Sequence, residues 1–561
     1  MITQSRIRTV CTLAAVAMAI LVLPAAADIP NPLPDPDTTP PDSTKPVKVY
    51  ILSGQSNMVG MGNISPLGTP GTLETITKTD GMFPNLLDDA GAWTVRNDVM
   101  YRGVITALGN APLTVGQGSA STAIGPELGF GHVMGYYFNE PVLGLKTSQG
   151  NRSLLWDCLP PGSPRFDYNG NTYAGYGDSP NSWPIGGGPS PYGWYAGKQY
   201  DDFFLAESDM GAPAWADATA YPAGCQVRHN GVTYISKSAH TSSADSEPGI
   251  GAQWATYWNV YSVFNVTDVL DNWATQYPQW AAQGFEIAGF VWWQGNKDLG
   301  EPGASRYETN LVPFIKQLRH YYENRYPGHI KTNAPFVLAT GCGDPGTSGY
   351  GLVVANAQLA VSGERGKYPE FAGNVKTMDT RGYWRSVAES PADQGYHYNR
   401  NAETFMLTGD ALGRGMVELL TPYSVDAGDD MITWSGRAVQ LDATVQDGVT
   451  VVSYAWRADP NDGVVFDSNS IEDPTVTITK ATENPSTVTL TLTVHDGVHP
   501  TVQDTMTIDV YDDACQAAIG MGLAADYPAD FDRNCVINFD DFALMATAWL
   551  DDNSLTEPVP K

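Results

Sequence analysis

The chain has 561 residues, with 31 basic against 61 acidic side chains and a formal net charge of −30. This length predicts two to four domains rather than one compact unit, and the apolar fraction of 42% suffices for ordinary cores. The negative charge argues against nucleic acid as a partner, because a polyanion would be repelled. We expect a soluble protein with an acidic surface.

The first 46 residues divide into two segments of different composition. Residues 1–27 combine two arginines, a central apolar stretch and three alanines before Asp28, an order typical of a secretory signal peptide. We therefore expect a secreted protein, located in the periplasm or outside the cell. Residues 28–46 are rich in Pro, Asp and Thr and predict an extended, solvated linker. No other apolar run is long enough to span a membrane, so no membrane partner is expected.

Export permits disulfide bonds. Cys11 lies in the predicted signal peptide, which leaves five cysteines in the exported chain: Cys158, Cys225, Cys342, Cys515 and Cys535. Because this number is odd, at least one of them has no partner within the chain.

Predicted strands and helices alternate along residues 47–421. Short apolar runs predict strands over residues 49–52, 142–145, 287–293, 336–339 and 375–378. Helical periodicity predicts helices over residues 126–138, 263–280, 307–322, 352–360 and 401–420, with Leu311, Phe314, Ile315 and Leu318 facing inward. The alternation predicts an α/β domain whose parallel sheet has helices on both faces. Ligands of such sheets bind at the carboxyl ends of the strands.

The first predicted strand ends in the words Ser-Gly54-Gln-Ser56-Asn-Met. A strand that stops at a glycine and passes a serine to a helix exposes that hydroxyl at the carboxyl edge, where helix amides stabilise an oxyanion. The alternative is that Ser56 caps the helix. Gly-Gln-Ser-Asn-Met resembles the nucleophile block of SGNH-type esterases, in the branch of sialate O-acetylesterases and acetylxylan esterases. The resemblance implies a flavodoxin-like sheet and Ser56 as the catalytic nucleophile.

The catalytic base of this family comes from an Asp-x-x-His phrase near the end of the domain. Here Asp393-Gln-Gly-Tyr-His397 stands between the last predicted strand and the closing helix, with a spacing one residue longer. The resemblance implies His397 as the base, and Asp393 as the acid that orients it. Asp298 is the alternative acid, and a Ser–His dyad is the third arrangement.

Two further blocks concern the oxyanion. Trp292-Trp-Gln294-Gly-Asn296-Lys-Asp298 resembles the Trp-x-Gln-Gly-Glu-Ser-Asp block of the family, with Asn296 where Glu often stands. The resemblance implies that Gln294 donates its amide N–H to the oxyanion. Gly150, in Lys-Thr-Ser-Gln-Gly, resembles the glycine that supplies a backbone donor. No cofactor is implied for catalysis.

Residues 214–260 interrupt this domain. They resemble the small aromatic carbohydrate-binding modules of the chitin- and cellulose-binding kind, through turn phrases such as Asn-Gly-Val-Thr-Tyr. Aromatic faces stack well on sugar rings, so the resemblance implies polysaccharide binding by Trp215, Tyr221, Tyr234 and Trp254. The alternative is that these aromatic residues form the core of a very small unit.

Residues 422–512 contain short β-rich runs separated by Asp, Gly, Asn and Pro clusters, which predict a β-sandwich. The phrases around Trp456 and His495 resemble the polycystic-kidney-type (PKD) immunoglobulin-like repeat. We expect Tyr454 and Trp456 to pack in its core.

The tail, residues 513–561, contains oxygen donors with the spacing of a calcium loop. Positions 1, 3, 5, 7, 9 and 12 are Asp530, Asp532, Asn534, Val536 (through its carbonyl), Asn538 and Asp541. This resembles a dockerin-type repeat and implies one bound Ca²⁺, although Cys535 replaces the usual Gly, Asp541 replaces Glu, and only one loop is present. The alternative is an acidic turn that binds nothing. We expect Cys515 and Cys535 to pair.

Together these observations predict a secreted serine esterase that removes acetyl groups from carbohydrate hydroxyls. Its expected partners are acetylated carbohydrate and, for attachment, a polysaccharide or cell surface. The alternative is a polysaccharide-binding scaffold whose esterase domain is inert.

Overall fold

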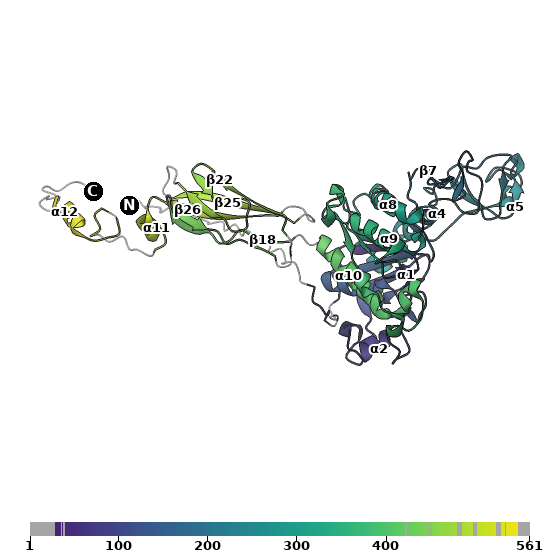
Figure 1. Cartoon of the computed structure of the whole chain (residues 1–561), viewed down its shortest axis with the longest axis horizontal. Helices are drawn as coiled ribbons and strands as arrows, with labels where there is room; N and C mark the ends of the chain where they lie inside the picture. The colour runs from purple at the N-terminus through teal and green to yellow at the C-terminus, as the bar shows by residue number, and fades with distance from the viewer. Residues whose placement is uncertain are drawn as a thin grey trace, which may run out of the picture.

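The structure is a computed structural model that describes residues 29–34, 36, 40–420, 423–446, 449, 451–479, 485–496, 502–522, 529–532 and 534–547. The predicted signal peptide lies outside the described residues. The described parts follow one another in an elongated series, from an α/β unit through a β-sandwich to a short tail with α11 (Ala514–Gly520) and α12 (Phe539–Thr547) (Figure 1). Among the helices described, none combines the length and the apolar character needed to cross a membrane.

The α/β unit is built on a seven-stranded sheet in which only the pair β3–β4 is antiparallel. In spatial order the strands are β17 (Val375–Met378), β16 (Phe336–Ala339), β15 (Phe285–Trp293), β1 (Val47–Gly54), β6 (Val142–Ser148), β3 (Arg96–Gly103) and β4 (Gly109–Leu113). Without the β3–β4 hairpin, the remaining strands stand in the chain order 2-1-3-4-5, which is that of flavodoxin-like sheets.

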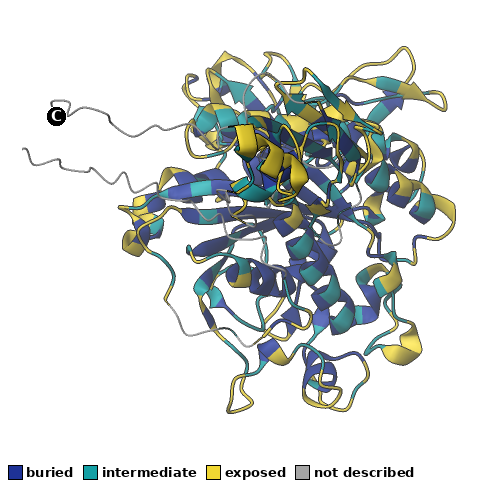
Figure 2. Ribbon diagram, turned by 90° about the vertical axis from the view of Figure 1, so that its left-hand side faces the viewer, coloured by how far each residue is buried: buried dark blue, intermediate teal, exposed yellow. Residues whose placement is uncertain are grey.

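Helices cover both faces of this sheet, because successive side chains of each strand point to opposite sides. Val49 and Ile51 of β1 pack toward α4 (Lys198–Phe204), α8 (Gly303–Arg325) and α9 (Gly349–Ala360). Tyr50 and Leu52 pack toward α3 (Pro126–Tyr137) and α10 (Ala402–Leu420). Figure 2 shows the buried strands between these helices. The predicted α/β class is confirmed.

Most predicted elements of this unit are present. The strands over residues 336–339 and 375–378 have the predicted bounds, and the four residues predicted to face inward from α8 are fully buried. The single helix predicted over residues 263–280 is wrong. The chain forms α6 (Val266–Asp271) and α7 (Trp273–Gln276), with Asn272 between them, and then a 3-10 turn beginning at Pro278.

The predicted solvated linker is wrong for its first residues. Leu33 is buried in the α/β core, and the carbonyls of Ile29 and Pro30 accept hydrogen bonds from Arg414 of α10. The aliphatic residues among the prolines therefore dock on a helix rather than remain in water.

The described strands between Tyr423 and Tyr511 form two larger β-sheets around one core and a short antiparallel pair, β18 (Val425–Asp426) with β21 (Thr444–Val445). One larger sheet contains β19 (Met431–Trp434), β26 (Val502–Tyr511), β25 (Ser486–His495) and β22 (Ser453–Asp459), and the other β20 (Ala438–Gln440), β24 (Thr475–Ile478) and β23 (Val464–Phe466). Trp456 is fully buried and donates to the carbonyls of Ile471 and Glu472, while Tyr454 packs against the core half-buried.

Candidate active site

Three neighbouring strands end at one edge of the sheet. Gly54 at the end of β1 is in register with Trp293 of β15 and Ser148 of β6. A Cβ on Gly54 would lie 2.1 Å from the carbonyl oxygen of Trp293, so only glycine allows the chain to turn this close to the neighbouring strand. The turn delivers the next residues to the carboxyl edge of the sheet, where such folds bind ligands.

Ser56 is the first residue of α1 (Ser56–Val59), and Gln55 holds the capping position. The alternative interpretation of Ser56 as a helix cap is therefore wrong. Gly150 lies beside it, since a Cβ on Gly150 would be 3.7 Å from the Cβ of Ser56. The structure thus brings together the predicted nucleophile and the predicted backbone donor.

The loop that carries His397 contacts the same turn. The side-chain amide of Asn57 donates to the carbonyl of Tyr396 at 3.3 Å. Tyr398, Asn399 and Arg400 follow with φ values of 50°, 51° and 57°, in the left-handed region that non-glycine residues rarely adopt. The buried ring of Tyr398 packs 5.3 Å from that of Trp293 and holds this strained segment. No pattern in the sequence predicted this role of Tyr398.

Asp393 does not orient His397 in this structure. Within the described residues, Nδ1 of His397 is buried and has no hydrogen-bond partner, whereas Asp393 is exposed. Burial lowers the pKa of His397, and the guanidinium of Arg400 adds a smaller shift in the same direction. The prediction that Asp393 accepts the Nδ1 proton is wrong for this geometry, because the buried Nδ1 of His397 has no acceptor among the described residues and the Asp393 side chain is exposed to solvent.

Asp298, the alternative acid, forms hydrogen bonds with residues other than His397. Its carboxylate accepts hydrogen bonds from the backbone of Leu154 (2.8 Å) and Leu155 (3.1 Å) and from Nε2 of Gln294 (2.6 Å). Burial raises the pKa of Asp298 to about 6, opposed by these hydrogen bonds. Asp298 therefore anchors the loop after β6, the loop that also carries Gly150.

Gln294 belongs to the same network. Besides Asp298, its Nε2 donates to the carbonyl of Arg152 at 2.9 Å, and its Oε1 accepts from the hydroxyl of Tyr307 at 2.8 Å. Because an amide nitrogen has two hydrogens, these acceptors use both, and the predicted donation to an oxyanion is not available in this geometry. Gln294 instead ties the strand end of β15 to the loop bearing Gly150.

The pKa of His397 yields a pH prediction. Burial, with Arg400 adding to it, lowers that pKa to about 4. A general base must be neutral. Were His397 the base of an ester hydrolysis, the acid limb of kcat/KM on a soluble acetyl ester would lie near pH 4, and Arg400→Gln would move that limb to higher pH. Between about pH 4 and 6.5 the unfolded chain binds a proton that the native imidazole does not, so stability also falls as the pH falls through this window. An acid limb near pH 6.5 in the wild type would contradict this.

The inserted unit places its aromatic residues unequally. Tyr221 and Tyr234 are 4% and 7% exposed and form a small core with Trp258, whereas Trp215 and Trp254 are half-buried at its edge. The two tyrosines are therefore packing residues, and their predicted stacking on sugar is wrong because no ring face is free. Sequence reasoning missed Trp258, the largest residue of this core.

The ends of the insert lie together. The hydroxyl of Ser262 and the backbone N–H of Val263 both donate to the carboxylate of Glu207. The unit between them is therefore attached to the α/β unit as a separate appendage.

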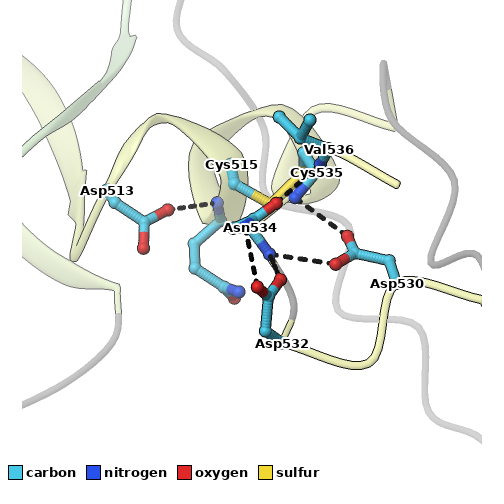
Figure 3. The surroundings of a disulfide bond; sticks show 8 residues. Asp513, Cys515, Asp530, Asp532, Asn534, Cys535 and Val536 are labelled. Carbon is cyan, nitrogen blue, oxygen red and sulfur yellow. Dashed lines mark hydrogen bonds between the residues drawn. A yellow bond between two sulfur atoms is a disulfide. The ribbon is translucent and has the colours of Figure 1, made fainter. Parts of the chain in front are cut away.

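The tail brings the predicted calcium ligands together. Carboxylate oxygens of Asp530, Asp532 and Asp541 lie within 4.8 Å of one another, and Cys515 and Cys535 form the expected disulfide (Figure 3). Cys535 has φ +63°, the left-handed conformation for which such loops use glycine. Hard carboxylate oxygens converging in this way fit Ca²⁺.

Comparison with known proteins gave the following. No protein-family model and no curated protein matches the chain. Among solved structures, a carbohydrate acetylesterase from Xanthomonas citri matches with a TM-score of 0.28 at 12% identity, over 79% of this chain and 74% of its own. NanS matches with a TM-score of 0.28 at 11% identity, over 63% and 85%. The PKD domain from the KIAA 1837 protein matches with a TM-score of 0.15 at 25% identity, over 17% and 91%.

Proposed function

We propose that this protein is a secreted serine esterase that removes acetyl groups from carbohydrate hydroxyls. The observation that carries the proposal is the position of Ser56. It begins a helix at the carboxyl edge of the central strand, next to Gly150 and against the loop of His397.

In the proposed reaction the hydroxyl of Ser56 attacks the ester carbonyl while His397 takes its proton. The backbone N–H groups of Ser56 and Gly150 hold the oxyanion. His397 returns the proton to the departing sugar hydroxyl, which leaves an acetyl group on Ser56. Water, deprotonated by His397, then releases acetate and restores the serine. Ser56 and His397 act as a dyad, and Asp298 and Gln294 fix the loop that carries Gly150.

The second candidate is a polysaccharide-binding scaffold with an inert esterase domain. The missing acceptor for Nδ1 of His397 among the described residues favours it. A chromogenic acetyl ester separates the two, because the enzyme turns it over and the scaffold does not. Acetate release from acetylated xylan, acetylated chitin oligomers and O-acetylated sialic acid would then identify the carbohydrate. No turnover of any of these esters would refute the proposed function.

We further propose that the insert attaches the enzyme to polysaccharide through Trp215 and Trp254. Because its ends meet at Glu207, excising residues 214–260 and joining the ends through a short glycine linker should leave the α/β unit folded. Retention on insoluble chitin or cellulose should fall several-fold, while turnover of a small soluble ester should stay within about twofold. Unchanged retention on both polysaccharides would contradict the attachment role.

We also propose that the tail binds one Ca²⁺ per chain, through Asp530, Asp532, Asn534, Asn538 and Asp541 and the carbonyl of Val536. Calorimetric titration of the full, oxidised chain with Ca²⁺ should show a single binding site. Asp530→Ala should remove this site, because it takes away one of the three carboxylates that converge there. Asp540→Asn is the matched control, since Asp540 is exposed and lies outside the ligand positions. A flat titration of the wild type would exclude the site.

A further inference from the structure

A pocket of about 230 Å³ opens beside the proposed active site. Its walls come from the loop after β6, through Ser153, Trp156 and Asp157, and from the segment after β15, through Lys297, Asp298 and Glu301. The first loop carries Gly150. The second contacts the nucleophile turn directly, because the backbone N–H of Lys297 donates to the side-chain oxygen of Gln55 at 3.2 Å. The pocket therefore adjoins the reacting edge without containing Ser56.

The size of the pocket limits its ligand. Pockets for drug-sized ligands occupy ~300–1,000 Å³, and this one is somewhat smaller. It suits one monosaccharide unit rather than a longer chain. Trp156 lies half-buried in its wall and offers an aromatic surface beside polar groups, the combination that suits a sugar ring with one apolar face and several hydroxyls.

The charge of the pocket limits its ligand further. The carboxyl groups of Asp157 and Glu301 and the ammonium group of Lys297 line the pocket, together with Asp298, whose two oxygens are already occupied by hydrogen bonds from the protein. Asp157 is 7% exposed and accepts hydrogen bonds from the backbone and hydroxyl of Ser153 through one oxygen. Carboxylates accept strong hydrogen bonds from sugar hydroxyls but repel a second carboxylate on the ligand.

The rim of the pocket is also negatively charged and has aromatic side chains nearby. Glu301 is exposed, and its charge helps to raise the pKa of Tyr168, after the larger effect of desolvation. Tyr168 lies on the hairpin of β7 (Phe166–Tyr168) and β8 (Asn171–Tyr173), and the guanidinium of Arg306 lies 4.2 Å over the neighbouring ring of Phe166. An aromatic hairpin held at an acidic rim extends the surface that a neutral glycan would contact.

We propose that this pocket binds a neutral sugar unit adjacent to the unit whose acetyl ester reaches Ser56, and that it discriminates against uronic and sialic acids. The proposal rests on the proposed esterase function for the identity of the substrate, but binding by the pocket does not require turnover. It makes a neutral acetylated polysaccharide the substrate class, rather than an O-acetylated sialic acid.

The test is calorimetric titration of the full chain carrying Ser56→Ala, with xylotriose and N-acetylated chitotriose as neutral probes and trigalacturonic acid and N-acetylneuraminic acid as acidic ones. We expect saturable binding of at least one neutral probe, at least tenfold tighter than either acidic probe. Adding Trp156→Ala should weaken binding of the neutral probe about tenfold. Adding Asn181→Ala, at an exposed lining residue, should weaken that binding several-fold without risk to the fold. Trp434→Ala in β19 is the matched control and should leave the affinity unchanged.

Neutral binding that survives both pocket substitutions would overturn the proposal and place the site elsewhere, for example in residues 214–260. Absence of neutral binding, or equal binding of an acidic probe, would overturn it as well. The two proposals fail separately. An enzyme that cleaves a chromogenic acetyl ester without binding these probes loses only the pocket, and a chain that binds them without esterase activity loses only the proposed reaction.

Discussion

Replacing Ser56 by alanine should reduce kcat on a chromogenic acetyl ester by a factor on the order of 10⁶, the cost seen when a serine hydrolase loses its nucleophile. The fold should not suffer. Ser56 occupies the first position of α1, and alanine is at least as favourable as serine in a helix. The measurement is steady-state turnover together with the melting temperature of the same preparation.

Ser148→Ala is the matched control for this experiment. Ser148 is buried at the same sheet edge, in register with Gly54, and within the described residues its hydroxyl has no hydrogen-bond partner. Its loss should change kcat less than about threefold. If Ser56→Ala keeps a tenth or more of the activity, Ser56 is not the nucleophile.

Replacing Lys146 by methionine should strongly destabilise the α/β unit. Lys146 is fully buried and donates to Glu127 at 2.9 Å, to the carbonyl of Val59 at 3.0 Å and to that of Gln117 at 3.2 Å. Burial lowers the pKa of its ammonium group, and Glu127 opposes that shift. Methionine would leave the Glu127 carboxylate buried without its counter-ion, which costs about 3–5 kcal/mol.

Scanning calorimetry on the full chain should show that the melting temperature of the α/β unit falls by at least about 5 °C, while the melting temperature of the β-sandwich does not change. The double variant Lys146→Met/Glu127→Gln should recover part of the loss, because the remaining side chain is neutral. Lys146 also holds the carbonyl of Val59, the last residue of the helix that begins at Ser56. The activity of Lys146→Met should therefore fall by more than the loss of folded protein alone accounts for. Equal melting temperatures for wild type and Lys146→Met would contradict this account of the ion pair.

The sequence predicted the parts of the fold that local pattern determines. Apolar runs located β16 and β17, and helical spacing identified the buried face of α8. The β3–β4 hairpin was missed because its residues are mostly polar or half-exposed, as expected at the edge of a sheet. Asn272, at the junction of α6 and α7, interrupts an otherwise helical pattern.

In the candidate site, the sequence placed Ser56 and Gly150 together through their motifs. It could not predict the partners of Gln294, because Asp298, Arg152 and Tyr307 reach its amide from separate loops and a helix. It also gave no geometry for the turn after Asp393, where three consecutive residues adopt left-handed φ values. Hydrogen-bond partners across such distances depend on the complete fold.

The three described cysteines outside the tail have a consequence for how the chain matures. Cys158, Cys225 and Cys342 are free and buried, and burial raises the pKa of all three thiols, which suppresses the reactive thiolate. In the exported protein proposed here, an oxidant would react with these thiols only before the α/β unit and its insert have folded. The pair that does form a disulfide, Cys515 and Cys535, lies C-terminal to these three cysteines and is separated by 20 residues. Mispairing is therefore avoided when the α/β unit and its insert fold, and bury these three thiols, before Cys515 and Cys535 are oxidised.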